Sequence, residues 1–396
     1  MSEKQISADE WNRVVDDTLE YHEKIKGRRT AVEWRAPATA YWTGITNRYV
    51  TADLIRRFAY AIGDPNPLWR DPNYARNTRW GSIIAPPVFE MNFGQPHGIR
   101  ETIHMPGFNN FDGGIAREYY TVIRPGDQIV YGVDTYLGCT EKTKPGSPYR
   151  TFLGQGQREL FNEKGEKVLK IIGSAILVGA PPGHEDASQQ PTAKVVRPHY
   201  TQEQLEALYT HYDEELAGKW RRGSETRYWE DVTEGEEIHQ VIKGPLDDSD
   251  LRSFISGAMG YTAAFANKWA LNKKEPRRFI HPETGAYKSD WDWHSDDDEA
   301  QRRGLANAIA EGKQNQTVIG HAISNWMGDD AFLKKMDLRN RAVKYLGDMD
   351  WGKGKVTKKY IEKGEHLVEL EVWAECQDGR IHTSGTAIVR LESRGK

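Results

Sequence analysis

Two stretches of the chain alternate apolar and charged positions at the spacing of an amphipathic helix, and each opens one half of the sequence. Residues 8–29 (ADEWNRVVDDTLEYHEKIKGRR) and 202–222 (QEQLEALYTHYDEELAGKWRR) are rich in acidic side chains and end in a basic pair. Apolar residues at helical spacing predict a helix with one face packed on a core. A second helical segment follows in each half, over 53–63 and 250–260. The two halves therefore begin with the same order of elements.

Residue identities at constant offsets indicate that the chain is an internal repeat. Identical residues lie 197 positions apart in the first part of the repeat and 225 apart in the second: Asp53/Asp250, Leu54/Leu251, Ala61/Ala258 and Gly63/Gly260, then Asp71/Asp296 and Ala75/Ala300. Because the offset grows from 197 to 225, the second half carries 28 extra residues between Gly260 and Asp296. We place this insertion at about 262–289.

Each half closes with β-branched and aromatic residues that alternate with polar ones, a pattern typical of strands. These runs span 119–178 in the first half and 339–391 in the second. Lys164-Gly165 and Asp378-Gly379 each predict a tight hairpin turn. Helices followed by long antiparallel strands, twice over, predict an α+β fold of two domains packed as a pseudo-dimer.

The segment between the halves, 179–198, is rich in proline and polar residues, which is typical of a linker. We expect an N-terminal domain over 1–180, a linker over 181–200 and a C-terminal domain over 201–396 that contains the insertion.

Composition narrows the class of protein. The 396 residues are 38% hydrophobic and 28% charged, with a net charge of -4, so no basic surface points to nucleic acid as a partner. No apolar run approaches the roughly 20 residues that span a bilayer, and the polar N-terminus lacks the apolar stretch of a signal peptide. The two cysteines, Cys139 and Cys376, are too few for a disulfide scaffold. We expect a soluble, cytoplasmic protein with no membrane association.

Residues 58–75 (FAYAIGDPNPLWRDPNYA) and 80–89 (WGSIIAPPVF) carry the one dense motif of the chain. The motif resembles the signature of the MaoC-like hydratases, the R-specific enoyl-CoA hydratases and acyl dehydratases. The matching positions are Gly63, Asp64, Asn66, Pro67, Leu68, Asp71, Ala75, Gly81, Ile84 and Ala85.

The resemblance implies two hot-dog domains, each a long antiparallel sheet wrapped around a central helix. It also implies a hydro-lyase that adds or removes water across the α,β bond of an acyl-CoA thioester, with no cofactor and no metal. In the family an aspartate and a histidine five residues later transfer the protons. A backbone N–H at the start of the central helix polarises the thioester carbonyl. On this resemblance Asn66, Trp69, Gly81, Ile84 and Ala85 are substrate-binding candidates. The many tryptophans hint at a bulky or aromatic acyl group.

The chain departs from the family pattern at the histidine position, which is Trp69 in the first half. An indole donates a hydrogen bond but cannot act as an acid or base near neutral pH. At the offset of 225, Trp69 falls on His294, so we expect His294 to transfer protons in a second-half site. At the offset of 197, Asp64 falls on Tyr261, a candidate hydrogen-bond donor. The acid partner of His294 is then Asp292 or Asp290 or, across the pseudo-dimer, Asp64.

Each of these residues also has a structural interpretation. Asp64 and Asn66 suit a turn in which their side chains cap the backbone, and Trp69 suits a core. His294 precedes Ser295 and the acidic run 296–299, which read as a capped helix start with a solvated histidine beside it. We expect His97 and His104 on the surface, and His321 and Trp326 in the core.

Two further functions stay open at this point. One is a different thioester enzyme, a hydrolase or lyase, with Asp64 as general base. The other is a non-catalytic hot-dog subunit that pairs with an active hydratase. A homodimer is compatible with all three interpretations.

Overall fold

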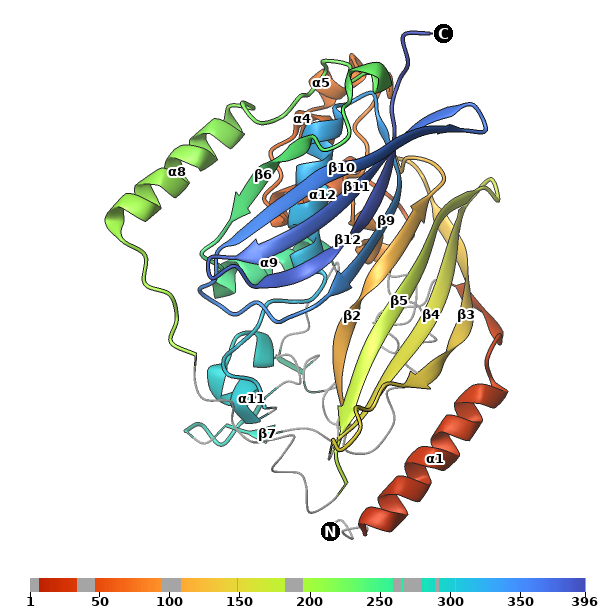
Figure 1. Cartoon of the computed structure of the whole chain (residues 1–396), viewed down its shortest axis with the longest axis vertical. Helices are drawn as coiled ribbons and strands as arrows, with labels where there is room; N and C mark the ends of the chain where they lie inside the picture. The colour runs from red at the N-terminus through yellow and green to blue at the C-terminus, as the bar shows by residue number, and fades with distance from the viewer. Residues whose placement is uncertain are drawn as a thin grey trace.

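The computed structural model describes residues 7–33, 47–93, 108–147, 149–181, 195–258, 265–266, 269, 279–281, 283–288, 292–302 and 304–395. Its main feature is one ten-stranded antiparallel sheet in the order β1-β3-β4-β5-β2-β9-β12-β11-β10-β6 (Figure 1). The first five strands are β1 (Arg29–Glu33), β3 (Ile129–Glu141), β4 (Arg150–Asn162), β5 (Lys167–Gly179) and β2 (Phe108–Tyr119). The other five are β9 (Phe332–Asn340), β12 (Ile381–Arg390), β11 (Glu365–Cys376), β10 (Asp350–Glu362) and β6 (Glu237–Lys243).

The two halves of the chain contribute equivalent strands in the same order, counted from the two edges of the sheet towards its centre. Strand β1 corresponds to β6 at the edges, and β2 to β9 at the centre. Strands β2 and β9 pair directly, with Gly114 opposite Arg339, and this seam joins the two halves into one sheet. Both predicted hairpin turns are confirmed. Gly165 connects β4 to β5 at φ +76°, and Gly379 connects β11 to β12 at φ +78°.

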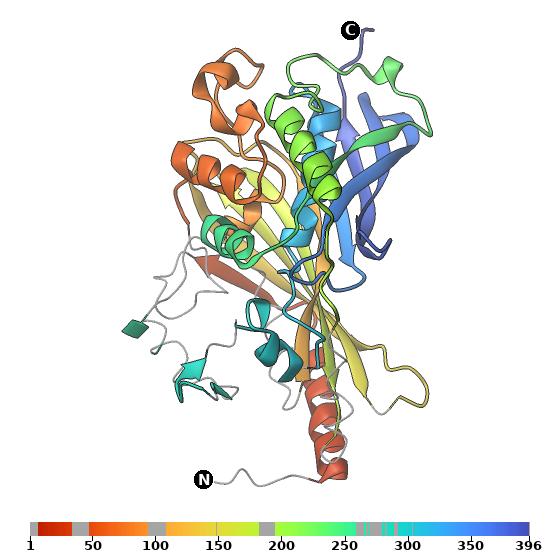
Figure 2. The ribbon, with the colours of Figure 1, turned by 90° about the vertical axis from the view of Figure 1, so that its left-hand side faces the viewer.

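The longer helices gather on one side of the sheet (Figure 2). They are α3 (Ala52–Ala61), α8 (Gln202–Leu216), α9 (Asp248–Ala258) and α12 (Gln314–Met327), while α1 (Ala8–Lys24) packs on the N-terminal strands. Helices α3 and α9, which the repeat relates, pack against each other. Gly257 permits this approach, since a Cβ there would lie 2.2 Å from the Cβ of Ala61.

Short elements connect the rest of the fold. They are α4 (Pro67–Arg70), α5 (Pro72–Arg76), η1 (Phe89–Phe93), η2 (Trp229–Asp231), η3 (Asp292–His294), α11 (Asp297–Arg302) and a two-stranded pair, β7 (Phe279–Ile280) with β8 (Tyr287–Lys288). Most of the predicted linker and insertion lies outside the described residues. The proposed domain boundaries therefore stay a prediction.

Helix α12 is the central helix of the second half. It packs on β6, β10, β11 and β12, and its residues from Asn315 to Met327 are all buried. At the offset of 225, its first residue, Gln314, falls on Phe89, the first residue of η1. The repeat therefore places a helical element after the motif in both halves, a 5-residue 3-10 helix in the first and a 14-residue α-helix in the second.

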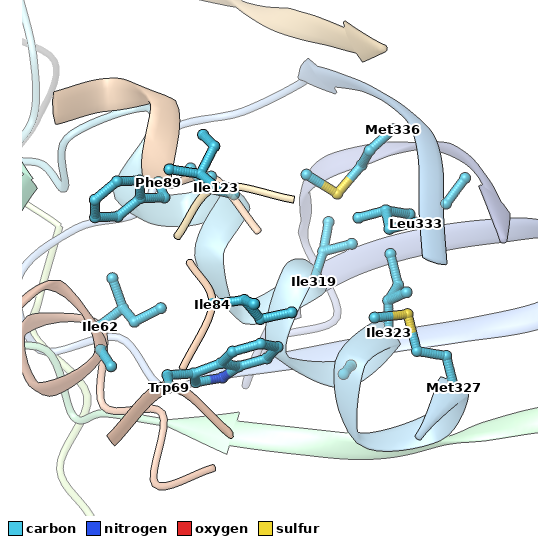
Figure 3. Packing of buried hydrophobic residues seen from close by; sticks show 14 of the residues in the cluster. Ile62, Trp69, Ile84, Phe89, Ile123, Ile319, Ile323, Met327, Leu333 and Met336 are labelled. Atoms are coloured by element: carbon cyan, nitrogen blue, oxygen red, sulfur yellow. The ribbon is translucent and has the colours of Figure 1, made fainter. Parts of the chain in front are cut away.

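One apolar core crosses from half to half. Figure 3 shows side chains of the 62–89 segment packed against α12 and β9. The labelled members are Ile62, Trp69, Ile84, Phe89, Ile123, Ile319, Ile323, Met327, Leu333 and Met336. Because each half supplies one side of this core, the halves pack as a pseudo-dimer. The antiparallel sheet and the helices that pack on it confirm the predicted α+β class.

Candidate functional site

The first-half motif folds into a tight loop in which Asp64 is already fully engaged. Asp64 Oδ1 accepts from the N–H of Asn66 at 3.0 Å, and Asn66 Oδ1 accepts from the N–H of Leu68 at 3.0 Å. The indole Nε1–H of Trp69 donates to Asp64 Oδ2 at 2.9 Å. The turn predicted for Asp64 and Asn66 is therefore present, and Trp69 covers the carboxylate.

The second half closes this loop from the other side. His321 of α12 places Nε2 3.5 Å from Asp64 Oδ1 and 3.1 Å from Glu215 Oε1 of α8. Asn325 Nδ2 donates to the same Glu215 oxygen at 2.9 Å. Burial raises the pKa of Glu215, but the His321 imidazole and the Asn325 amide outweigh that effect and lower it to about 2. We call Asp64, Trp69, Glu215, His321 and Asn325 the sealed cluster.

The sealed cluster offers no surface to a substrate. Asp64 is 1% exposed, Trp69 2% and His321 2%. Sequence analysis assigned His321 to the core and missed its contact with Asp64. No local pattern relates the two residues, which are brought together only by the packing of one half on the other.

The N–H at the start of η1 is also occupied. Val88 has φ +71°, a left-handed conformation that costs energy for a β-branched residue. Its N–H donates to the hydroxyl of Tyr119 at 3.4 Å, and burial raises the pKa of that hydroxyl. In the first half, both groups that the family resemblance assigns to thioester chemistry are therefore engaged within the protein. They are the Asp64 carboxylate and the N–H before η1.

The second-half motif brings different groups together around His294, which lies in η3 and is 6% exposed. Its Nδ1 is 2.9 Å from the carbonyl oxygen of Ile309. A carbonyl only accepts, so Nδ1 carries the proton and Nε2 is the basic nitrogen. The alternative of a solvated histidine is wrong. The N-cap assigned to Ser295 is also wrong, because Asp296 Oδ1 accepts from the N–H groups of Asp298 and Glu299 at 3.0 and 3.1 Å.

The segment after Ile309 leads directly into α12 and carries a buried ion pair. Glu311 Oε2 accepts from the N–H of Lys313 at 2.8 Å, and its Oε1 lies 3.4 Å from Lys313 Nζ. Burial raises the pKa of Glu311, but the charge of Lys313, the charge of His294 when that imidazole is protonated, and the Lys313 N–H bring it below its ordinary value. Glu311 is therefore an ionised carboxylate close to His294.

A strand of the first half completes this group. Asp112 lies on β2, and Asn340 of β9 donates its Nδ2–H to the Asp112 carbonyl at 3.0 Å. Gly312 fits against both residues because it has no side chain. A Cβ there would lie 2.8 Å from Asp112 Cβ and 2.9 Å from Asn340 Nδ2. We call Asp112, His294, Glu311, Gly312 and Lys313 the seam cluster.

The start of α12 adds unsatisfied polar groups beside the seam cluster. The first N–H groups of a helix lack intrahelical partners and favour an oxygen that carries negative charge. In α12 two of them are already used, because the N–H of Asn315 donates to the Glu311 carbonyl at 3.3 Å and that of Gln316 to the Lys313 carbonyl at 3.1 Å, which leaves the N–H of Gln314. In the first turn, Gln316 is 0% exposed, and neither its Nε2 nor its Oε1 has a hydrogen-bond partner among the described residues. Buried amides are normally paired, so this site is built to receive a polar group.

Sequence analysis found His294 but missed Asp112, Glu311 and Gly312. The signal for the last two was available, since the offset of 225 also aligns Ile84-Ala85 with Ile309-Ala310 just before them. Asp112 carries no comparable signal.

The remaining candidates have varied positions. Gly81, Ile84 and Ala85 lie in the loop that follows α5 in the first half. Gly81 has φ +67°, Ile84 is 6% exposed, and Ala85 donates its N–H to the Ile123 carbonyl at 2.9 Å. Asp292 lies in η3, one residue before Trp293. Tyr261, Asp290, His97 and His104 lie outside the described residues.

Two features are absent from the described residues. No group of three or more His, Cys, Asp or Glu side chains among them is arranged to hold a metal ion. Within those same segments, none of the helices has the length and apolar character that crossing a bilayer requires.

Comparison with known proteins supports the family resemblance. Residues 38–170 match the family model described as the FAS1-like, dehydratase domain region. A solved MaoC-like dehydratase superposes with a TM-score of 0.60 at 18% identity, over 94% of this chain and 99% of that one. A MaoC domain protein dehydratase from Chloroflexus aurantiacus J-10-fl superposes with a TM-score of 0.54 at 13% identity, over 93% and 96% of the two chains.

A curated relative matches only locally. The UPF0336 protein of Thermobifida fusca (strain YX) is 55% identical over 40 residues, which are 10% of this chain and 26% of that protein. The chain thus matches about a quarter of the length of that relative. The fold is that of the MaoC-like dehydratases, and the predicted double hot-dog arrangement is confirmed. In the first half, the sequence also matches a dehydratase region.

Proposed function

We propose that the protein is an acyl-CoA dehydratase or enoyl-CoA hydratase whose reaction takes place at the seam cluster. The observation that carries the proposal is the hydrogen bond from His294 Nδ1 to the Ile309 carbonyl. It fixes a buried imidazole with a basic Nε2 against Ile309, which lies five residues before the start of α12. The match of the first half to a dehydratase region supports the same class of reaction.

The chemistry follows from these groups. His294 Nε2 takes a proton from water as the water oxygen bonds to the β-carbon. The electron pair of the double bond then moves towards the thioester oxygen, which the N–H of Gln314 at the start of α12 stabilises. An acid delivers a proton to the α-carbon. The dehydration direction reverses each step, and no redox or metal chemistry is required.

The ionised Glu311 has an electrostatic role in this scheme. Its negative charge stabilises the imidazolium that forms when His294 accepts a proton. Asp292 and Asp290 remain proposals as acid partners from the motif, and Tyr261 as a hydrogen-bond donor. For Asp64 we propose a structural role, because Trp69 and His321 enclose its carboxylate.

The surroundings of the seam cluster suit an apolar acyl group. The rings of Phe111 and Trp293 lie 5.9 Å apart between centroids, and those of Trp293 and His294 4.9 Å apart. Tyr345 belongs to the same apolar cluster. An aromatic wall beside the imidazole favours a bulky or aromatic acyl chain over a short polar one. Coenzyme A is the proposed carrier, and a homodimer or a hot-dog partner subunit is the proposed assembly.

A panel of 2-enoyl-CoA thioesters tests the proposal. Hydration is followed by the loss of the ultraviolet absorbance of the enoyl thioester, and the 3-hydroxyacyl product is identified by mass. We expect turnover that falls at least about 100-fold in His294→Gln. The exposed His199 provides the matched control, and His199→Gln should retain full turnover. Full turnover in His294→Gln would overturn the proposal.

The same assay separates the competing functions. Release of free coenzyme A, detected with a thiol reagent, indicates a hydrolase in place of a hydratase. Turnover that arises only when a second hot-dog chain is added indicates a non-catalytic subunit.

A further inference from the structure

The two oxygens of Asp112 have different hydrogen-bond partners from those of Glu311, the other carboxylate of the seam cluster. Oδ1 accepts from the N–H of Gly114 at 2.8 Å. Oδ2 is buried, has no hydrogen-bond partner among the described residues, and has Lys313 Nζ at 3.9 Å. The side chain keeps 18% of its surface exposed, against 7% for Glu311. One oxygen is thus held firmly while the other stays available.

The pKa values of the two carboxyl groups beside Lys313, Asp112 and Glu311, are shifted in opposite directions. Burial, reinforced by the charge of Glu311, raises the pKa of Asp112 in spite of Lys313, Gly114 and Arg117, which act to lower it. The pKa of Glu311 is lowered. Proteins can make one of two neighbouring carboxyl groups an acid and keep the other charged. They do so by giving the two groups environments that move their pKa values apart. Of the two carboxyl groups, Asp112 is therefore the one that keeps its proton to the higher pH.

One face of α12 packs against the first half of the chain, and Asp112 contacts the turn just before this helix. Gly312 contacts Asp112, and Gly320 faces Pro87, where a Cβ would lie 3.1 Å from Pro87 Cβ. Gln316 lies one turn before Gly320 on α12, so it shares the face of Gly320, and it follows closely on the turn at Gly312 that contacts Asp112. Its unpaired, fully buried amide therefore lies between Asp112 and the 86–88 loop. This is an independent sign that a polar ligand group enters here.

We propose that Asp112, supplied by β2 of the first half, is the acid that protonates the substrate α-carbon opposite His294. This assignment rests on the proposed function. It replaces the aspartate that the second-half motif lacks with one from across the β2–β9 seam. The repeat thus works as one site assembled from both halves.

The proton balance of the step is complete. Water gives one proton to His294 Nε2 and its oxygen to the β-carbon, and the carboxylic acid of Asp112 gives its proton to the α-carbon. Product release leaves an imidazolium and a carboxylate. Transfer of one proton from His294 to Asp112, directly or through water, restores the starting state.

The test is Asp112→Asn, which keeps a carbonyl oxygen for the Gly114 N–H but has no acidic proton. We expect kcat to fall at least about 100-fold with little change in KM. The alkaline descent of the kcat/KM profile, where the acid loses its proton, should also disappear. Asp112→Glu should recover part of the rate and keep a descent. Asp337→Asn, on β9 beside the seam and 48% exposed, is the matched control and should behave as the parent.

The outcomes separate the two proposals. If His294→Gln is inactive but Asp112→Asn keeps turnover within about threefold of the parent with the same pH profile, Asp112 is not the acid and the proposed function stands. If His294→Gln keeps full turnover, or the parent hydrates no thioester of the panel, the proposed function fails and the assignment of Asp112 fails with it. Should Asp112→Asn not fold, Asp112→Glu decides. An alkaline descent at the same pH as in the parent would then count against Asp112.

Discussion

The indole Nε1–H of Trp69 donates a 2.9 Å hydrogen bond to Oδ2 of Asp64. Both residues are at most 2% exposed, and they stand five positions apart, where the related family pattern has a histidine and an aspartate. The tryptophan therefore does more than remove an imidazole. It supplies a donor to the carboxylate and fills the space around it, which supports the structural role proposed for Asp64.

Trp69→Phe tests how much this bond stabilises the fold. Phenylalanine fills most of the same volume but leaves Asp64 Oδ2 buried without its donor. Because an unpaired buried carboxylate oxygen is costly, we expect the free energy of unfolding to fall by about 2–3 kcal/mol, measured by urea denaturation. Trp229→Phe is the control, since that half-buried indole donates to the neutral carbonyl of Leu367. Its expected cost is about 1 kcal/mol. Equal losses would show that the charge on Asp64 does not matter.

Asp64→Asn addresses the catalytic role of this carboxylate. Its oxygens are occupied by Asn66, Trp69 and His321, so no substrate atom reaches them. We expect kcat/KM for a 2-enoyl-CoA, measured per folded protein, to stay within about threefold of the parent, while general acid–base groups contribute about 100-fold or more. A loss as large as that of His294→Gln would return Asp64 to the active site.

Much of the fold was predictable because the determining signals are local. Gly165 and Gly379 each predicted a hairpin, and alternating strand residues predicted the sheet. The repeat offsets located His294 as the counterpart of Trp69. Followed past Ala300, they also align Ile309-Ala310, directly before Glu311 and Gly312.

The rest of the site depends on packing between segments remote in sequence. Asp112 reaches Gly312 only because β2 and β9 pair across the seam, and His321 reaches Asp64 only because α12 lies against the 64–69 loop. Hydrophobic periodicity shows which face of an element is buried but not which partner it is buried against. Asp112 lies before the predicted strand run of 119–178, and no pattern in the sequence marks it.

Glu215→Gln provides a test based on pH. The pKa of Glu215 is about 2 in the folded protein, below its ordinary value of 4.5, so ionised Glu215 contributes stability above pH 4.5 that is lost as pH falls through the folded value. Glutamine has no charge to pair with His321. We expect Glu215→Gln to cost about 3 kcal/mol at pH 7, with the difference from the parent narrowing below about pH 4.5. Urea denaturation down to the lowest pH at which the parent folds measures this difference.

The neighbouring residue offers the control for that experiment. Glu214 is on the same helix but pairs with Lys219 at 2.6 Å on the surface. Exposed pairs contribute little, so Glu214→Gln should change stability by less than about 1 kcal/mol. A Glu215→Gln deficit that does not narrow with falling pH would show that lost packing, not charge, is responsible.

Gly114→Ala tests the seam on which the composite site depends. Gly114 has φ +112°, and a Cβ there would lie 2.2 Å from the backbone oxygen of Leu338, so the methyl group must push β2 and β9 apart. Gly165→Ala is the matched control, because its φ is also positive, at +76°, but a Cβ there meets open space. We expect Gly165→Ala to cost about 1–2 kcal/mol, the price of backbone strain alone. Gly114→Ala should cost at least about 3 kcal/mol and speed amide hydrogen exchange in β2 and β9 first. If both variants lose the same stability with no local change in exchange, then the two halves do not meet as closely at Gly114 as the Leu338 contact requires.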